Sequence, residues 1–441
     1  MEVKIEQFRN NSCNFIFLLY LIGLLFVPID LNITTKIINA TGAFSLFLLI
    51  VNKKHNYNKN VIILILGLLL LGAMNLIWYE FYKTEDVVYR NAYRGYLESG
   101  KLLVFSSLTF LLLSKNKFRQ NEKLHFISAI LVQIIMLCRA YYQGIYLHAD
   151  RIPLSAMNGN IGQMGAATIA AYVITFTTLY SSIVFIKMQS KYKWFLFYAN
   201  FALSFAAVMM TGTRAAIFTF PLMIMVILFL QHRDQKVFLF KGLSGVFILL
   251  LACGLIFNKE IERRINSLKA DVISYATKNN SQSSVGARFA MVNAGIKGSP
   301  DGFNWQSLEQ RAEKIKALSA DNNIYSGALL FLDVHMHNEI VEALSTKGKI
   351  GLLVLIMFYV AIIYYCIREK KYILLVFPAS IMLFGISDVI THAKPIPASW
   401  IVCLFLSISF LSKKNRNNKN VDLKDVSMFY LYNDDNFSKT A

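Results

Sequence analysis

The chain has 441 residues, of which 56% are hydrophobic and only 16% are charged. A soluble domain usually carries charge on about a quarter of its residues, so this composition excludes an ordinary soluble globular protein. The formal net charge is +19. Repeated apolar runs of membrane-spanning length, without alternation of period two, predict an all-α integral membrane protein.

Twelve apolar segments are predicted to cross the membrane. In chain order they lie near residues 13–30, 33–51, 60–80, 98–114, 123–145, 161–186, 194–210, 213–231, 237–257, 349–367, 371–390 and 396–412. This order divides the chain into four parts. They are spans 1–9 within residues 1–257, an outer helical loop at 258–348, spans 10–12 within 349–412, and a tail at 413–441.

Lysine and arginine alternate in density from one short loop to the next. The rich loops hold Lys53, Lys54, Lys59, Lys115, Lys117, Arg119, Lys123, Lys187, Lys191, Lys193, Arg233, Lys236, Arg368, Lys370 and Lys371. Because cation-rich loops face the cytoplasm, we expect both termini and the tail there, and the 258–348 loop on the opposite side. Much of the positive charge is then topological and meets anionic membrane lipids, so a nucleic-acid partner is not needed to explain it.

The loop at 258–348 is predicted to form helices over the outer ends of the spans. Residues 259–278 place Ile261, Ile265, Leu268, Val272 and Ile273 at helical spacing. This pattern indicates an amphipathic helix that lies at the membrane interface.

The rest of the loop predicts two more helices and a turn. Ser284-Val285-Gly286-Ala287-Arg288 is typical of a cap followed by a helix, and residues 298–302 form a turn cluster rich in glycine. Residues 306–318 predict a polar helix whose charged side chains, Arg311 among them, face solvent.

Arg214 ends the sequence Thr211-Gly212-Thr213-Arg214, a tight turn between two predicted spans on the outer side. The turn places Arg214 in the first turn of the following helix, with the threonines as expected caps. Free N–H groups, the positive end of the helix dipole and a guanidinium then converge, which favours an anion. An arginine that reaches up to lipid headgroups explains the same residue, so the anion site depends on its neighbours.

Other polar residues of the outer side are weaker candidates. Arg90 and Arg94 are four residues apart and either hold a phosphate or cap a span. Asn160, in Asn158-Gly159-Asn160, either hydrogen-bonds sugar hydroxyls or caps a helix.

The segment Asp333-Val334-His335-Met336-His337-Asn338-Glu339 closes the outer loop just before the chain re-enters an apolar run. Two imidazoles, an amide and a carboxylate therefore sit where an enzyme acting on a lipid-linked substrate needs polar chemistry. His335 and His337 with Asp333 have some metal character, but the sequence offers no convincing further ligands, so we predict no metal site. Glu339 or Glu342 could orient an imidazole, and Glu342 could equally be a charge on the helix surface.

Three of these patches together carry a resemblance. The TGTR turn with Arg214, the SVGAR sequence with Arg288, and His337-Asn338 followed by Gly348-x-x-Gly351 resemble the O-antigen ligase/polymerase superfamily of bacterial inner membranes. As topology the likeness covers residues 150–414. The spacing and the helix number are most similar to those of the O-antigen ligases.

The resemblance implies a glycosyltransferase that needs no metal, nucleotide or other cofactor. It implies an undecaprenyl-diphosphate-linked O-antigen donor, a lipid A–core acceptor and a site on the periplasmic face of the inner membrane. Family roles carry over to Arg214 and Arg288 as diphosphate-binding residues and to His337 as the residue acting on the acceptor hydroxyl. His335 is additional to the family pattern, which leaves open which imidazole works.

The chemistry of these residue types agrees with such roles. Arginine binds phosphate oxygens in bidentate fashion, and a neutral imidazole can take the proton of a sugar hydroxyl during attack. Direct attack inverts the anomeric carbon. Two alternatives remain: a polymerase of the same superfamily, which differs in its acceptor, and a flippase or transporter. Transporters place charges in the middle of spans, whereas these span interiors are nearly free of charge.

Overall fold

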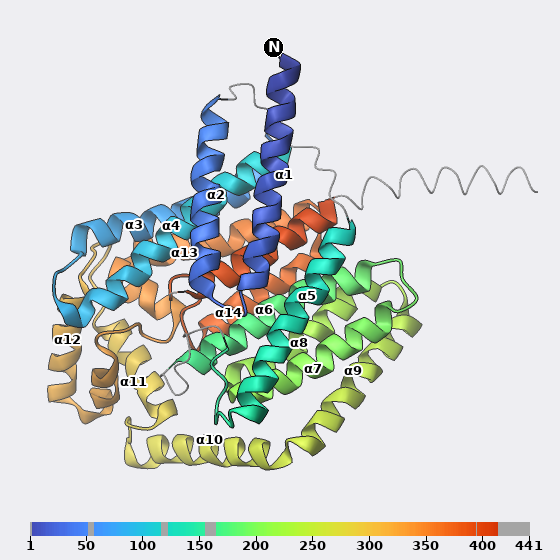
Figure 1. Cartoon of the computed structure of the whole chain (residues 1–441). Helices are drawn as coiled ribbons and strands as arrows, with labels where there is room; N and C mark the ends of the chain where they lie inside the picture. Colours follow the sequence, from blue (N-terminus) through green and yellow to red (C-terminus); the bar gives the residue numbers. More distant parts are fainter. Residues whose placement is uncertain (1, 52–56, 116–121, 155–164, 394, 413–441) are drawn as a thin grey trace, which may run out of the picture.

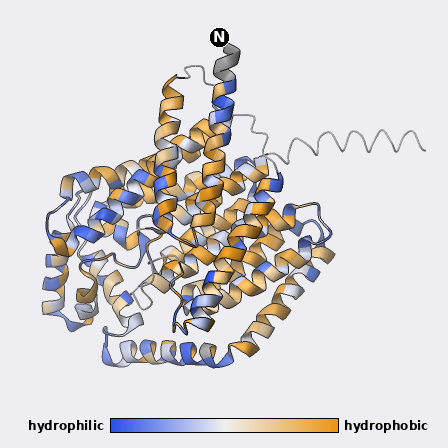
Figure 2. Cartoon of the chain, viewed as in Figure 1, coloured by the Kyte–Doolittle hydropathy of each residue, from blue (hydrophilic) through white to orange (hydrophobic). Residues whose placement is uncertain are grey.

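A computed structural model describes residues 2–51, 57–115, 122–154, 165–393 and 395–412. Within these ranges every regular element is a helix, which confirms the predicted all-α class (Figure 1). Colouring by hydropathy shows apolar residues along the long helices and hydrophilic residues concentrated on α10 and at the helix ends (Figure 2). The predicted tail at 413–441 and Asn160 lie outside the described residues.

The helices cover the apolar runs of the sequence, but α1 and α4 each begin 11 residues before the predicted span. Their bounds are α1 Glu2–Phe26, α2 Leu31–Val51, α3 Lys59–Tyr82, α4 Val87–Lys115, α5 Glu122–Tyr141, α6 Ala166–Lys187, α7 Lys193–Thr211, α8 Arg214–His232, α9 Lys236–Ile256, α13 Glu339–Arg368 and α14 Val376–Gly385. A last apolar helix spans Ile396–Ser412. Among the described residues, nine helices are long and apolar enough to cross a membrane, so the chain is a multi-pass membrane protein. The total of twelve spans stays a prediction.

Helix α6 lies at the centre of the bundle. It packs against α5, α7, α8 and α14, and nearly all of its side chains are buried. A helix that is surrounded on all sides needs no polar face, which explains its apolar sequence. The central position matters for the site, because α6 carries the buried Tyr172.

The outer loop folds into the helices that the sequence predicts. They are α10 (Asn258–Lys278), α11 (Ser284–Lys297) and α12 (Leu308–Asp321), followed by the 3-10 segment η2 (Asn323–Phe331). The Ser283 hydroxyl caps α11 by accepting the Gly286 N–H at 3.0 Å, and Ser307 with Gln310 forms a capping box on α12. Helix α10 runs along the edge of the molecule as an extended rod (Figure 1).

One prediction for α12 is wrong. Arg311 does not face solvent: its side chain is 0% exposed and pairs with Glu342, which is 1% exposed and is not a surface charge either. Arg311 lies on the same buried face of α12 as Leu308, Ala312 and Ile315, where a charge is unexpected without a partner from another element.

Helix α13 contains a break that separates an outer part from the membrane part. At Gly348 the backbone has φ 57° and ψ −154°, conformations that favour glycine. A Cβ there would lie 2.5 Å from the Asn304 carbonyl oxygen, so glycine is also required by space. The outer part, Glu339–Lys347, therefore points its side chains independently of the apolar run predicted at 349–367.

The segment after α14 differs from the prediction. We expected a span at 371–390, but the chain forms the 3-10 turn η3 (Tyr372–Leu375), then α14, and leaves the helix at Gly385. A Cβ on Gly385 would lie 2.7 Å from Glu339 Oε2, so another side chain occupies that space. Residues 386–393 form an irregular segment that carries Asp388 and His392.

Candidate active site

Residues 333–338, called here the histidine loop, connect η2 to α13. Asn338 is the N-cap of α13: its Oδ1 accepts the Val341 N–H at 3.0 Å. Its Nδ2 donates to the Ile386 carbonyl oxygen at 3.0 Å. One amide therefore starts α13 and ties the histidine loop to the 386–393 segment, although the two are about 50 residues apart in the sequence.

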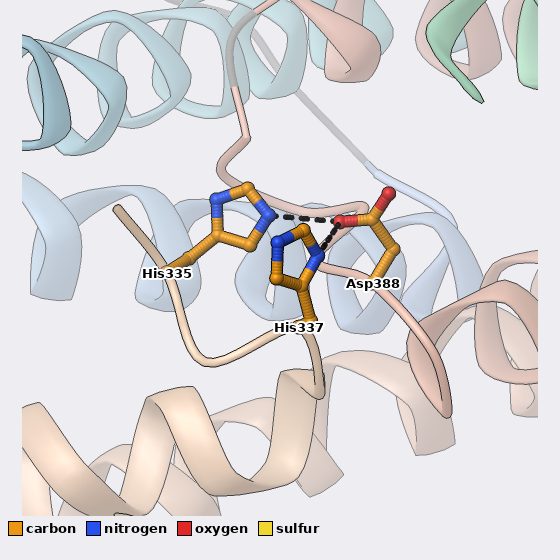
Figure 3. Close-up of side chains that lie close together, drawn as sticks. All are labelled: His335, His337 and Asp388. Atoms are coloured by element: carbon orange, nitrogen blue, oxygen red, sulfur yellow. Dashed lines mark hydrogen bonds and ion pairs between the residues drawn. The ribbon is translucent and has the colours of Figure 1, made fainter. Parts of the chain in front are cut away.

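His335, His337 and Asp388 meet where these two segments touch (Figure 3). His335 Nε2 lies 2.8 Å from Asp388 Oδ1, and His337 Nδ1 lies 3.4 Å from the same oxygen. The Tyr172 hydroxyl of α6 donates to the other carboxylate oxygen at 3.0 Å. The predicted histidine pair is thus completed by a carboxylate and a tyrosine that the sequence reasoning missed.

The protonation of the three groups follows from burial and from one another. Burial alone would raise the pKa of the Asp388 carboxyl, but hydrogen bonding and charge from the two histidines hold it well below its ordinary range. Burial tends to lower the pKa of His335, and the interaction with Asp388 outweighs this and raises it. Burial lowers the pKa of His337, and the charge of His335 lowers it further. His337 is therefore the neutral imidazole at neutral pH.

The two imidazoles offer different nitrogens. His337 turns Nδ1 toward Asp388, which leaves Nε2 as the nitrogen able to accept a proton. His335 turns Nε2 toward Asp388, which leaves only Nδ1, the nitrogen beside its own backbone. A carboxylate that faces Nδ1 and leaves Nε2 for the substrate is similar to the arrangement of general bases of the serine-hydrolase type, although the 3.4 Å contact of His337 is no hydrogen bond. Geometry and pKa both favour His337 as the base.

The same three residues are the candidate metal ligands. Among the described residues, only His335, His337 and Asp388 form a group of three whose ligand atoms all lie within 4.8 Å of one another. Catalytic zinc is held by three protein ligands, so the set suffices in number. The carboxylate, however, already accepts from His335 at hydrogen-bond distance, so charge and hydrogen bonding account for the cluster without an ion.

Arg214 is the first residue of α8, as predicted. Its Nη2 donates to the Ser267 hydroxyl of α10 at 3.0 Å, and its Nη1 lies 3.6 Å from the Asp271 carboxylate. Thr213 does not cap the helix. Instead its hydroxyl accepts from Arg151 Nη2 at 3.2 Å, and Arg151 Nε donates to the Thr211 carbonyl oxygen at 2.8 Å.

Four arginines gather around this turn. The guanidinium of Arg264 packs directly on the Cα of Gly212, where any side chain would clash with it. Burial lowers the pKa of Arg151, and the positive charges of Arg264, Arg288 and Arg214 lower it further. We call these four residues the arginine cluster. Like charges this close repel one another, so an anion placed among them would be strongly stabilised.

Arg288 connects the arginine cluster to the histidine loop. It lies in the first turns of α11, and its charge acts both on Arg151 and on His337, whose pKa it helps to lower. Its guanidinium is half-buried. Helix α11, which carries Arg288, also packs on the histidine loop, because Met336 is buried with Ala290, Met291 and Ala294.

The remaining predicted residues have other environments. Glu339 is buried and accepts the Thr391 N–H at 2.7 Å and the Tyr359 hydroxyl, so it anchors α13 to the 386–393 segment and orients neither imidazole. Arg94 is exposed and pairs with Glu98 at 3.4 Å, and Arg90 is exposed near the start of α4. In the described part of the chain, no contact joins Arg90 or Arg94 to the histidine loop.

A signal for Asp388 was present in the sequence. It is an acidic residue at the end of an apolar run that was interpreted as a span. A charge inside a predicted span is a functional candidate by default, since it is costly there. Arg151 and Arg264 carried no comparable signal, because each stands in a polar segment with other charges nearby.

The part of the chain that resembles a known protein family includes the predicted diphosphate-binding and catalytic residues. A family model described as O-antigen ligase matches residues 199–356, a range that includes Arg214, Arg288 and His337. The chain is 31% identical over 407 residues to the O-antigen ligase of Escherichia coli (strain K12), covering 91% of this chain and 93% of that protein.

The chain belongs to the O-antigen ligase family. It is also 26% identical over 427 residues to an uncharacterized protein of Haemophilus influenzae, with 93% of this chain and 96% of that protein covered. Both proteins match the chain along nearly its whole length. Asp388 lies beyond the part that the family model matches.

Proposed function

We propose that this member of the O-antigen ligase family transfers a polysaccharide from undecaprenyl diphosphate to a sugar hydroxyl of lipid A–core. The observation that carries the proposal is the arrangement of the arginine cluster beside a neutral, carboxylate-oriented His337, with Arg288 acting on both. One part suits a diphosphate and the other suits a hydroxyl.

The arginine cluster is the proposed binding site of the donor diphosphate. Arg214 and Arg288 provide the principal contacts, and Arg151 and Arg264 add charge from the other sides. Departure of the lipid diphosphate leaves negative charge on its oxygens, which planar guanidinium groups stabilise through paired hydrogen bonds. Arg214 already pairs with one anionic group, the Asp271 carboxylate, at 3.6 Å.

His337 is the proposed general base. Its Nε2 takes the proton of the acceptor hydroxyl as the oxygen attacks the anomeric carbon, and Asp388 stabilises the resulting imidazolium. Such assistance contributes about 100- to 10,000-fold in rate. The bond from the anomeric carbon to the diphosphate oxygen breaks as the new glycosidic bond forms. Direct displacement of this kind inverts the anomeric configuration, and no step of it requires a metal.

The proposed location is the bacterial inner membrane, with both termini in the cytoplasm and the site on the periplasmic face. Reporter fusions test this orientation. Fusions at Lys117, Lys191 and Lys370 should report the cytoplasm, and a fusion at Asp301 should report the periplasm. A cytoplasmic Asp301 would place the site in the wrong compartment and overturn the proposal.

The activity is tested with the purified full-length chain, undecaprenyl-diphosphate glycan and rough lipopolysaccharide. A ligase should move the glycan onto lipid A–core and should leave the donor unchanged when no acceptor is present. A ladder of longer lipid-linked glycans without acceptor would instead identify a polymerase. Absence of both products, with the lipid-linked glycan moved across vesicle membranes, would identify a transporter.

A further inference from the structure

Arg311 of α12 and Glu342 of α13 form an ion pair that is shielded from solvent. Arg311 Nη1 lies 2.9 Å from Glu342 Oε2, and the two side chains are 0% and 1% exposed. Removing both charges from water is costly, and apolar side chains of similar size often hold two elements together at least as well. The pair therefore calls for an explanation other than the attachment of α12 to α13.

Both members of the pair hold the backbone of the histidine loop. Arg311 Nη2 donates to the Val334 carbonyl oxygen at 2.7 Å, and Glu342 Oε2 accepts the Met336 N–H at 2.7 Å. Val334 and Met336 are the residues on either side of His335, and Met336 also precedes His337. The two peptide groups that flank His335 are thus fixed by one charged pair, one residue before His337. Apolar side chains could not form these two hydrogen bonds.

The histidine loop needs such support because its conformation is strained. His337 has φ 46°, in the left-handed region that favours glycine. A non-glycine residue stays there only when its surroundings impose that conformation. The side chain of Met336 is buried among Ala290, Met291 and Ala294 of α11. The buried Met336 side chain holds the loop against α11, and the two hydrogen bonds hold the backbone on either side of His335.

The other oxygen of Glu342 is held as well. Oε1 accepts the Tyr96 hydroxyl of α4 and lies 3.7 Å from His392 Nε2 in the 386–393 segment. The rings of Tyr96 and His392 stack at 4.3 Å. Burial lowers the pKa of His392 to about 4, so this imidazole is neutral and Arg311 is the cation that pairs with Glu342. Glu342 is therefore oriented by α4, α12 and the 386–393 segment together.

We propose that Arg311 and Glu342 are positioning residues for the transfer reaction, clamping the histidine loop so that both imidazoles face Asp388. The inference rests on the proposed function of His337. Neither residue touches the imidazoles, so neither is a catalytic residue: Asp388 orients the base, and the clamp places the backbone that carries it. Because the arginine cluster belongs to α8, α10, α11 and the loop before α6, loss of the clamp leaves the donor contacts of Arg214 in place.

The first test replaces each member conservatively. Arg311→Lys keeps the charge but has a single nitrogen, which cannot reach both Glu342 and Val334. Glu342→Gln keeps the shape but removes the charge. In the purified transfer assay, we expect each change to lower kcat about 10- to 100-fold, as for residues that orient the groups doing chemistry. The KM for the lipid-linked donor should stay within about twofold, because uniform substrate binding is not altered.

The second test separates positioning from packing. Arg311→Met combined with Glu342→Leu replaces the pair by apolar side chains that can keep α12 on α13. If the pair acts as a clamp, the double variant should be folded, as shown by its thermal melting temperature, and should have a low kcat. Lys371→Met is the matched control: it also removes a buried cation, one bonded to Ser412 and Tyr365, and should keep full kcat. Wild-type kcat in the folded double variant would overturn the clamp.

Failure of the clamp and failure of the proposed function give different results. If His337→Ala is fully active, the base is assigned wrongly whatever Arg311 does. If His337→Ala is inactive while Arg311→Lys and the double variant keep kcat, the proposed function stands and the clamp is wrong. An equal rise in donor KM and fall in kcat would also count against the clamp, because it would show that the change reaches the arginine cluster.

Discussion

The histidine–aspartate site and the arginine cluster are neighbours, yet they are held in opposite ways. His335, His337 and Asp388 are fixed by a left-handed residue, a buried ion pair and hydrogen bonds from α6, α12 and α13. The arginines come partly from α10 on the edge of the molecule and repel one another, and Arg214 contacts one hydroxyl and one carboxylate of α10. The proposed base is thus held by contacts from three helices.

The difference corresponds to two kinds of work. Proton transfer depends on placement within fractions of an ångström, so the base must be fixed before the substrate arrives. A diphosphate on a long lipid is attracted by charge from a distance and satisfies several cations at once. If this comparison is correct, substitutions in the two parts should separate into effects on kcat and effects on KM.

The largest effect is expected for the base. His337→Ala should reduce kcat by about 100- to 10,000-fold, the usual contribution of a general base, while the protein still inserts at normal levels. His335→Ala should be milder, since its free nitrogen faces its own backbone. The measurement is transfer by purified protein. His148→Ala is the control, a change of an exposed histidine outside the site that should be neutral. Full activity of His337→Ala would show that His337 is not the general base.

Asp388→Asn should have the next largest effect, about 100-fold on kcat with little change in KM. The amide cannot stabilise an imidazolium. At present the activity should fall as pH falls through the pKa of His337, which lies below the ordinary value of 6.5. Loss of the carboxylate removes the interaction that raises this pKa, so the acidic limb of the pH–rate profile should move to still lower pH. A shift to higher pH would contradict the assignment.

Arg214→Lys should act on the other part of the comparison. A lysine keeps the positive charge but not the bidentate geometry, so we expect the KM for the donor to rise about tenfold. Arg214→Ala and Arg288→Ala remove the charge and should abolish transfer. The matched control is Arg94→Ala, because Arg94 is an exposed arginine paired only with Glu98 among the described residues. If Arg214→Lys changes kcat alone, the arginine cluster and the histidine–aspartate site would not differ in the way proposed.

The smallest expected effect is that of chelation. EDTA should leave the transfer rate unchanged, because the proposed reaction assigns charge stabilisation to arginines and proton transfer to His337. The rate is compared before and after dialysis against EDTA, and after adding back zinc or magnesium. If the transfer rate falls after EDTA and only one of these metals restores it, His335, His337 and Asp388 would be identified as a metal site.

Much of the fold follows directly from the sequence. Apolar runs of spanning length predicted the long helices, and Ser284 and residues 306–318 predicted α11 and α12 in the outer loop. Arg214, Arg288 and His337 were found through short motifs whose local structure the chain confirms: the first turn of a helix, a capped helix start and a loop before α13. These signals depend on residues close together in the chain, so a single sequence is enough to find them.

The residues that were missed depend on contacts between distant segments. Asp388 was interpreted as part of a span, because nothing local shows that α14 ends at Gly385 and that Asp388 meets His335 from a segment about 50 residues away. Arg311 shares the face of Leu308, Ala312 and Ile315 on α12, and the position of Glu342 explains why a charge is buried there. Local periodicity shows which face of one helix is covered, but it does not show which partner the covering helix brings.

The order of these contacts along the chain has a consequence for biosynthesis. Tyr96, Tyr172, Arg311 and His337 all emerge before Asp388, which stands in the segment that follows α14. A nascent chain that has delivered α13 to the membrane carries the arginines and both histidines but lacks the carboxylate they face. Under the proposed function, such a chain has cations for the diphosphate but no carboxylate to orient the base. We therefore expect it to be unable to transfer glycan until the segment after α14 is in place.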